Sequence, residues 1–119
     1  MKEIKILIID DEPIITYSLQ RYLSDKGYDV TAVTEGNKAL SLLDTEDFDI
    51  LLTDLKMQPV SGLEIISNLK KKNFKGRIII MTAFCREHAD EIENLKVDAI
   101  LEKPFELQYL LDKIKELSK

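Results

Sequence analysis

Five side chains suited to chemistry come directly after short apolar segments of the chain: Asp10, Asp11, Asp54, Thr82 and Lys103. Three of them are carboxylates, whose like charges destabilise one another at short range unless a cation intervenes. A hard divalent cation with oxygen ligands is the simplest choice, and Mg²⁺ commonly takes one or two carboxylates while it keeps water molecules and a phosphate oxygen. If the five residues meet, they predict a shallow Mg²⁺ site with an open coordination position, which implies chemistry.

The first apolar segment shows how such residues are positioned. Ile4 to Ile9 is short, almost wholly apolar and rich in isoleucine, as expected of a strand that is covered on both faces of a parallel sheet. It ends at Asp10. Pro13 then suits the first turn of a helix, and apolar residues recur at helical spacing until Gly27 supplies a stop.

The same alternation of strand and helix returns four more times along the chain. The expected pairs are Tyr28 to Val33 with a helix from about Asn37 to Asp44, Phe48 to Thr53 with about Leu63 to Lys72, Arg77 to Met81 with about Arg86 to Leu95, and Ala99 to Leu101 with about Glu106 to Leu117. Strict alternation favours a five-stranded parallel sheet with helices on both faces, a doubly wound α/β fold. In such sheets the ligand crevice lies beyond the carboxyl ends of the strands, where the candidate residues stand.

Each candidate residue also has a simpler interpretation when it is taken alone. Asp10 or Asp11 could cap the helix that begins near Pro13, and Thr82 could merely end a strand. Asp54 could be an ordinary loop residue, and a lysine is usually a solvated charge. Their joint placement at one edge of the sheet favours the functional interpretation.

These residues make the chain similar to the receiver domain of two-component response regulators over essentially its whole length. The acidic pair of that family corresponds to Asp10 and Asp11, its phosphate-accepting aspartate to Asp54, its hydroxyl residue to Thr82 and its lysine to Lys103. The resemblance implies a CheY-like, flavodoxin-like three-layer sandwich with five helices and strand order 2-1-3-4-5. Periodicity alone predicts only the alternation.

Secondary marks agree with this resemblance. Met57 and Gly62 stand three and eight residues after the acceptor aspartate, and Ala83 follows the hydroxyl residue. Pro104 and Phe105 follow the lysine, and in relatives the peptide bond between the lysine and this proline is cis.

The resemblance implies that Asp54 attacks the phosphorus of a phosphohistidine on a sensor histidine kinase or a histidine phosphotransfer protein, forming an acyl phosphate. Lys103 would bind one phosphoryl oxygen as a point charge, and Thr82 would donate a hydrogen bond to another. Ala83 would leave room for the group.

The same resemblance implies a Mg²⁺ cofactor and its ligands. Asp11 and Asp54 would bind the cation directly, Asp10 would bind it through a water molecule, and the backbone carbonyl of Lys56 would complete the protein's share. The domain is then a phosphoacceptor that catalyses only its own phosphorylation and dephosphorylation, and not an enzyme acting on separate substrates.

The output would come from the surface formed by the fourth helix, the fifth strand and the fifth helix, whose arrangement phosphorylation shifts. This chain has Ile100 where relatives carry an aromatic switch residue, so coupling is expected to run through the fourth helix and its preceding loop, near Phe84. Lys56 and Phe84 occupy the two positions that flank the site, and neither side chain has a carboxylate or amide that could activate water. The acyl phosphate is therefore expected to hydrolyse slowly. Gln58 and Pro59 depart from relatives that place proline directly after the methionine.

Composition limits the class of protein and its partners. The 119 residues fit one domain, residues 1–119, and the net charge of -5 argues against nucleic-acid binding. Cys85 is the single cysteine and no secretion or membrane signal is visible, so a cytoplasmic location without membrane attachment is expected.

The first helix offers Ile14, Ser18 and Arg21 to a kinase helix, and phosphorylation-dependent homodimers are implied by the resemblance. The basic cluster from Lys70 to Arg77 is expected to be a solvated helix end.

A competing function is a Mg²⁺-dependent phosphohydrolase that uses Asp54 as nucleophile. Phosphatases of that type place a second aspartate two residues on as general acid, where this chain has Lys56. A nucleotide or flavin site is disfavoured because the glycines at 27, 36, 62 and 76 are too scattered for a phosphate-binding loop. An inactive scaffold is disfavoured because the acidic pair, Asp54 and Lys103 are all present.

Overall fold

The computed structural model describes residues 3–55, 60–83 and 89–118. Within these ranges five strands alternate with five helices, which confirms the predicted pattern. The strands are β1 (Lys5–Ile9), β2 (Asp29–Val33), β3 (Ile50–Asp54), β4 (Arg77–Thr82) and β5 (Ala99–Glu102). The helices are α1 (Pro13–Asp25), α2 (Gly36–Thr45), α3 (Gly62–Lys71), α4 (Ala89–Leu95) and α5 (Leu107–Leu117).

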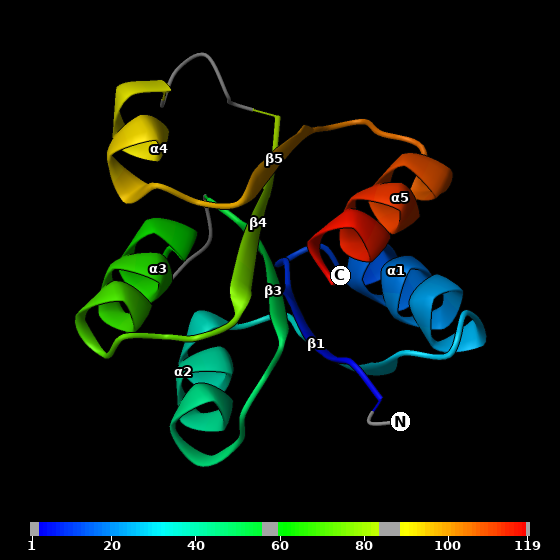
Figure 1. The fold of residues 1–119 in the computed structure, drawn as a ribbon, viewed down its shortest axis with the longest axis horizontal. Coiled ribbons are helices and arrows are strands. Elements are labelled where there is room, and N and C mark those ends of the chain that lie inside the picture. Colours follow the sequence, from blue (N-terminus) through cyan, green and yellow to red (C-terminus); the bar gives the residue numbers. More distant parts are fainter. Residues whose placement is uncertain (1–2, 56–59, 84–88, 119) are drawn as a thin grey trace.

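The five strands form one parallel sheet in the order β2-β1-β3-β4-β5. Figure 1 shows α1 and α5 together on one face of the sheet and α2, α3 and α4 on the other. The strand order therefore reverses between β1 and β3, as in the doubly wound fold that the resemblance implied. This reversal is where a ligand crevice is expected in an open α/β sheet.

The apolar run in β1 explains why this strand lies at the centre of the sheet. Residues Ile6 to Ile9 are all 0% exposed. Ile6 and Ile8 pack in the cluster that includes residues of α1 and α5, whereas Leu7 and Ile9 pack in the cluster that includes residues of α2 and α3. A strand that buries both of its faces needs apolar residues at successive positions, and each buried isoleucine or leucine contributes about 1.5 to 3 kcal/mol.

Several boundaries differ from those predicted. β3 begins at Ile50 instead of Phe48. Asp49, just before it, contacts the start of β1 through its carboxylate, which accepts a hydrogen bond from the amide of Lys5 (2.8 Å). β3 also extends to Asp54, which pairs with Met81 in the ladder, so this candidate site residue ends the strand and does not follow it. Thr82 likewise ends β4.

Helix boundaries show smaller differences. α4 is described from Ala89, and the predicted start at Arg86 lies outside the described residues. α1 begins at Pro13 as predicted and ends at Asp25, and Gly27 follows with a φ of 97°, a left-handed conformation that favours glycine. The Lys103–Pro104 peptide bond is cis, in agreement with the resemblance. Among the helices of the described ranges, none combines the length and the apolar character that crossing a bilayer requires.

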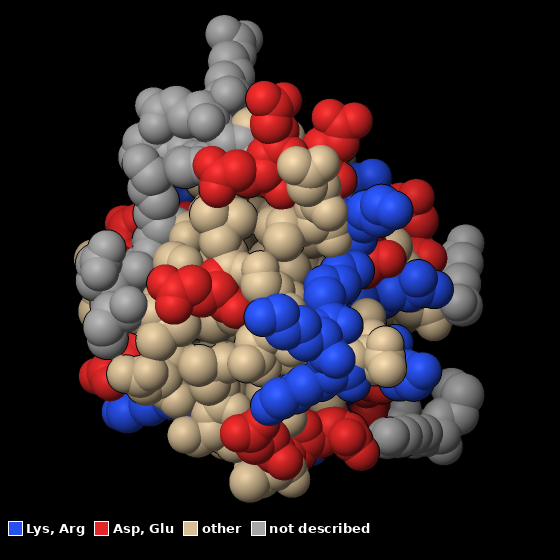
Figure 2. All heavy atoms as spheres, turned by 90° about the vertical axis from the view of Figure 1, so that its left-hand side faces the viewer, with Lys and Arg blue, Asp and Glu red and all other residues tan. Residues whose placement is uncertain are grey.

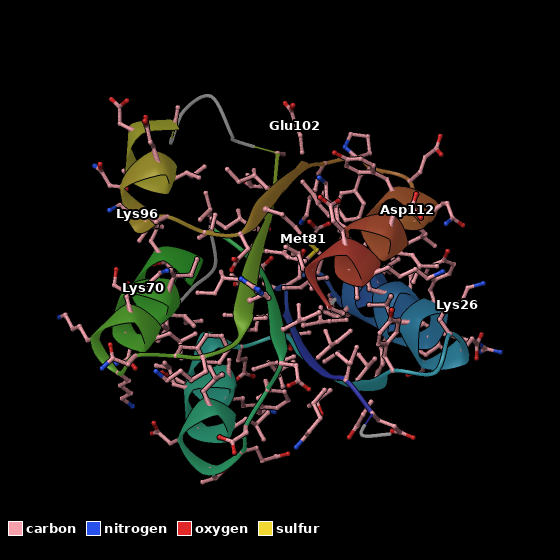
Figure 3. All side chains as sticks on the ribbon, in the orientation of Figure 1. Lys26, Lys70, Met81, Lys96, Glu102 and Asp112 are labelled. Atoms are coloured by element: carbon pink, nitrogen blue, oxygen red, sulfur yellow. The ribbon has the colours of Figure 1, made fainter. Side chains whose placement is uncertain are left out.

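The face formed by α2, α3 and α4 carries separated charges. Figure 2 shows Lys and Arg side chains in a band across its middle, with Asp and Glu side chains above and below. The ammonium group of Lys70 donates a hydrogen bond to the carbonyl oxygen of Lys96 (3.1 Å), and Figure 3 shows these two residues on the same outer side of α3 and α4. Lys72 pairs with Asp44 of α2 at 2.5 Å. These contacts agree with the expected solvated helix end.

Candidate functional site

The carboxyl ends of four strands bring the predicted site residues to one edge of the sheet. Ile9 of β1 is in register with Thr53 of β3, so the next residues, Asp10 and Asp54, lie side by side at the carboxyl edge of the sheet. Thr82 ends β4, which neighbours β3. The candidate acids therefore meet because their strands are adjacent, although they lie far apart in sequence.

Lys103 connects the acids of β1 and β3. Its ammonium nitrogen Nζ lies 2.5 Å from Oδ2 of Asp10 and 3.0 Å from Oδ2 of Asp54. The Asp10 side chain is 0% exposed, that of Asp54 11% and that of Lys103 14%. The amide of Lys103 donates to the carbonyl oxygen of Thr82 (2.9 Å), which attaches the lysine to the end of β4. One cation thus holds two buried carboxylates in fixed positions.

Burial and charge act in opposite directions on these groups. Burial raises the pKa of Asp10, and hydrogen bonds from Lys103 and from the amide of Glu12 offset part of that rise. For Lys103 burial lowers the pKa, but hydrogen bonds and attraction from Asp10 and Asp54 together outweigh burial and raise it above its ordinary value. The lysine is therefore a permanent positive charge in the site at neutral pH.

Four acidic side chains form a cluster, and three of them, Asp10, Glu12 and Asp54, pair with this lysine. One carboxylate oxygen from each of Asp10, Asp11, Glu12 and Asp54 lies within 4.8 Å of the others. Asp10 and Asp54 are buried, whereas Asp11 and Glu12 are exposed, so the cluster opens to solvent on one side. An open set of closely spaced carboxylate oxygens fits Mg²⁺, which prefers oxygen ligands and retains water.

Glu12 was not anticipated from the sequence. Its Oε1 lies 3.7 Å from Nζ of Lys103, and its carboxylate belongs to the acidic cluster. The run of three consecutive acids from Asp10 to Glu12 was a signal that could have identified it.

Asp10 is not the N-cap residue of α1, as the simpler interpretation had it, but it binds the residue that is. Its Oδ1 accepts a hydrogen bond from the amide of Glu12 (3.0 Å), and its own amide donates to the carbonyl oxygen of Val33 (3.3 Å). Glu12 is the N-cap residue of α1, and its side chain makes no capping hydrogen bond. Asp10 therefore shapes the turn before α1 and also faces Lys103.

The first residue of α3, Gly62, packs closely against the backbone of Asp54 and Leu55. The amide of Gly62 donates to the carbonyl oxygen of Leu55 (2.9 Å), and a Cβ atom built on Gly62 would lie only 1.8 Å from the carbonyl oxygen of Asp54. The hydroxyl of Thr53 donates to that same oxygen (2.9 Å). Only glycine permits this approach, which explains why Gly62 stands near the candidate acceptor.

Other predicted residues are placed as follows. Thr82 is fully buried at the end of β4, and Ala83 after it is exposed. Lys56, whose carbonyl was expected to bind the cation, lies outside the described residues. Met57, Gln58, Pro59, Phe84, Cys85 and His88 also lie outside them.

An apolar hollow adjoins the site on the α1 side. It has a volume of about 250 Å³, and its lining includes Ile14, Ser18, Lys103 and Phe105. Ile14 is 81% exposed. A larger hollow of about 600 Å³ lies at the opposite edge of the sheet, near the first residues of β3 and β4, and none of the candidate site residues lines it.

An α/β sandwich with an acidic cluster and one lysine at its topological switch point defines the class of CheY-like domains. The chain belongs to the response regulator receiver domain family, whose model matches residues 6–115. It is therefore a receiver domain of two-component signalling systems.

Individual relatives agree with this family. The chain is 37% identical over 114 residues to the response regulator SaeR of Staphylococcus aureus, a match covering 94% of the chain and 49% of SaeR. The chain thus spans about half the length of the curated relatives it matches.

Solved structures of response regulators share the fold. A CheY-like receiver domain protein from Methanospirillum hungatei superposes with a TM-score of 0.91 at 29% identity, covering 97% of this chain and 93% of that one. The response regulator TrrA of Thermotoga maritima, solved in complex with Mg²⁺ and BeF, gives a TM-score of 0.86 at 31% identity and covers 96% and 98%.

Proposed function

We propose that residues 1–119 form one receiver domain whose Asp54 accepts a phosphoryl group from a sensor histidine kinase or a histidine phosphotransfer protein. The observation that carries the proposal is the ammonium group of Lys103 between the buried carboxylates of Asp10 and Asp54. This arrangement holds a nucleophile and a positive charge together at the switch point of the sheet, at the edge of an acidic cluster.

The reaction needs little covalent help from the protein. A carboxylate oxygen of Asp54 forms a bond to phosphorus while the bond between phosphorus and the donor's imidazole nitrogen breaks, and that nitrogen keeps the electron pair and takes a proton. The Asp54 side chain is 11% exposed, so a donor can reach it while its neighbours hold its orientation. Phosphoryl transfer depends on such positioning and on neutralising charge that spreads over the transferring oxygens.

Lys103 and Thr82 are proposed to share that neutralisation. The Lys103 ammonium already lies 3.0 Å from Oδ2 of Asp54, next to the atom at which the phosphoryl group arrives. Thr82 is on the strand next to β3 and would donate a hydroxyl hydrogen bond to the group. Ala83 adds little bulk beside it.

The oxygen ligands at the site suit Mg²⁺, and the complex of the related TrrA with Mg²⁺ and BeF supports this cofactor. Asp11 and Asp54 would bind the cation directly, Asp10 would bind it through water, and the carbonyl of Lys56 would supply a further oxygen. When bound, Mg²⁺ neutralises charge on the phosphoryl oxygens.

The proposed docking surface for the histidine-containing partner is the exposed side of α1. Ile14 lines the apolar hollow beside Lys103, and Ser18 lies one turn further along the helix. Arg21 donates a hydrogen bond to the hydroxyl of Tyr17 (3.1 Å), which is 62% exposed. A partner helix seated there would lie close to Asp54.

The remaining parts of the proposal concern output and location. Phosphorylation is proposed to alter the α4-β5-α5 surface and to promote weak homodimers or contact with an effector. The net charge of -5 favours protein partners over nucleic acid, and we place the domain in the cytoplasm. The domain is proposed to act on no separate substrate, since no observation on the described part of the chain favours a phosphohydrolase.

The test is incubation with acetyl phosphate and Mg²⁺ followed by intact mass measurement. A stoichiometric, Mg²⁺-dependent phosphoryl adduct is expected for the native chain and for Asp112→Asn, a matched change on exposed α5. Asp54→Asn should show none. An adduct on Asp54→Asn would refute the assignment of the acceptor, and turnover of a phosphomonoester without an adduct would favour the hydrolase.

A further inference from the structure

The start of α2 contacts Val60, which lies between Asp54 and α3 in the sequence. Gly36 is the first residue of α2 and is buried. A Cβ atom built on Gly36 would lie 2.5 Å from the carbonyl oxygen of Val60 and 2.7 Å from the Cβ atom of Val60. Glycine is not required there by its backbone, because Gly27 alone among the described glycines has a positive φ. The requirement comes from the contact with Val60.

Val60 is linked to Asp54 through its near neighbour Gly62, which makes two short contacts with the end of β3. Two residues after Val60, the amide of Gly62 donates to the carbonyl oxygen of Leu55 (2.9 Å). The Cα of Gly62 lies against the carbonyl of Asp54 so closely that a Cβ atom would be 1.8 Å from its oxygen. A displacement of Val60 and Gly62 away from α2 is therefore transmitted to the backbone of Asp54.

The side chain of Val60 supports the same linkage. It packs against the core cluster that contains Leu7 and Ile9 of β1 and Ala39 of α2. Since α2 is held to the sheet through this cluster, its first residue provides a firm surface for Val60. The interior is close-packed, so a small shift there moves its neighbours and is not absorbed by empty space.

We propose that Gly36 is a positioning residue for phosphorylation: the close approach of α2 to Val60, which only glycine allows, sets the position of the segment that holds Asp54. The inference rests on the proposed function of Asp54. A methyl group at position 36 would require most of an ångström of movement before its contacts reached ordinary separations, which begin at 3.4 Å. A misplacement of about 1 Å costs about 100-fold in rate when it reaches the reacting groups, so a loss of about 10- to 100-fold is expected.

The matched control is Gly76→Ala. A Cβ atom on Gly76 would lie 2.7 Å from the carbonyl oxygen of Phe48 and 2.8 Å from that of Asp49, so the added methyl group meets similar crowding. Gly76 directly precedes β4, at the end of the sheet opposite to the site. Both substitutions should destabilise the fold, but only Gly36→Ala should disturb Asp54.

The experiment compares the native chain, Gly36→Ala and Gly76→Ala in three measurements. These are urea unfolding, the rate of adduct formation with acetyl phosphate and Mg²⁺, and the amide NMR shifts of Leu55 and Gly62 in metal-free protein. We expect both variants to unfold at lower urea concentrations. Gly36→Ala alone should react about 10- to 100-fold more slowly and should alone shift the two amide signals.

The inference is overturned if Gly36→Ala reacts as fast as the native chain, or if Gly76→Ala is slowed equally. If Gly36→Ala does not fold, Val60→Ala tests the same contact by removing side-chain packing without adding bulk, and an unchanged rate and unchanged Leu55 and Gly62 signals would overturn it. If the native chain forms no adduct, the proposed function fails, whereas the NMR comparison still decides whether position 36 controls the backbone near Asp54.

Discussion

Replacing Lys103 by methionine should show how much its ion pairs with Asp10 and Asp54 stabilise the fold. Methionine has a similar length and no charge, so the change removes the ammonium group from between Asp10 and Asp54 while filling much of the same space. The variant then keeps two buried carboxylates without the cation that holds them. In the absence of Mg²⁺ we expect a less stable domain.

The size of the loss follows from the burial of the three side chains. Removing one partner of a buried ion pair costs about 3 to 5 kcal/mol, because the remaining charge stays desolvated. Asp10 is fully buried, but Asp54 and Lys103 are 11% and 14% exposed, so water can partly replace the ammonium group. We therefore expect the lower end, about 3 kcal/mol, which corresponds to a melting temperature lower by about 10 °C for a domain of this size.

The loss should depend on pH. Burial raises the pKa of Asp10, and Lys103 lowers it by hydrogen bonding and attraction, so removing the lysine raises that pKa further. A carboxyl group whose pKa is higher in the folded state favours folding below its ordinary value of 3.8, and this contribution disappears as the pH rises through the raised pKa. The stability deficit of Lys103→Met should therefore shrink in acid and reach its full size at neutral pH.

The assay is thermal unfolding in chelator and in saturating Mg²⁺. Because a divalent cation can replace the missing positive charge, Mg²⁺ should stabilise Lys103→Met more than the native chain. Lys113→Met is the matched control, since Lys113 pairs with exposed Glu116 at 3.6 Å and should cost about 0.5 kcal/mol or less. Equal melting temperatures of the two variants in chelator at neutral pH would refute the reasoning.

Three further predictions concern the surroundings of the site. Ser61→Ala should lower the free energy of unfolding by about 1 kcal/mol, measured in urea, because Ser61 accepts a hydrogen bond from the amide of Glu64 (3.2 Å) and caps α3. Gly62→Ala should abolish adduct formation from acetyl phosphate, because the new Cβ atom would lie 1.8 Å from the carbonyl oxygen of Asp54, and a native rate would contradict this. Ile100→Tyr, on edge strand β5 where Ile100 is 43% exposed, should alter phosphorylation-dependent association in size-exclusion chromatography, and unaltered association would argue against a coupling role for this position.

The sequence predicted the fold well where burial on both faces leaves few alternatives. The run from Ile6 to Ile9 was recognisable as a central strand because every position is apolar, and all four residues are 0% exposed. Less regular boundaries were predicted less well. β3 starts at Ile50 and not at Phe48, and the hydrogen bond between the Asp49 carboxylate and the amide of Lys5 is a long-range contact that no local pattern reveals.

The site could be predicted as a set of residue types but not as a set of contacts. Alternation placed Asp10, Asp54 and Lys103 near the carboxyl ends of strands, yet their contact depends on a strand order that came from resemblance and not from periodicity. The position of Lys103 between two carboxylates requires three-dimensional information. The crowding of Gly36 and Gly62 against neighbouring backbone was also invisible, because a missing Cβ atom leaves no sequence pattern to detect.

The uneven burial of the sheet separates two kinds of mechanical behaviour. The acids stand at the ends of β1 and β3, whose residues are almost all buried, whereas β5, at one margin of the sheet, alternates between covered and exposed positions. Amide hydrogens on the interior strands should exchange with deuterated solvent only through opening of the whole domain, and those on β5 through cheaper local opening. If Asp54 accepts a phosphoryl group as proposed, the new charge arrives at the end of a fully buried strand, while β5 can rearrange without unfolding of β1 and β3.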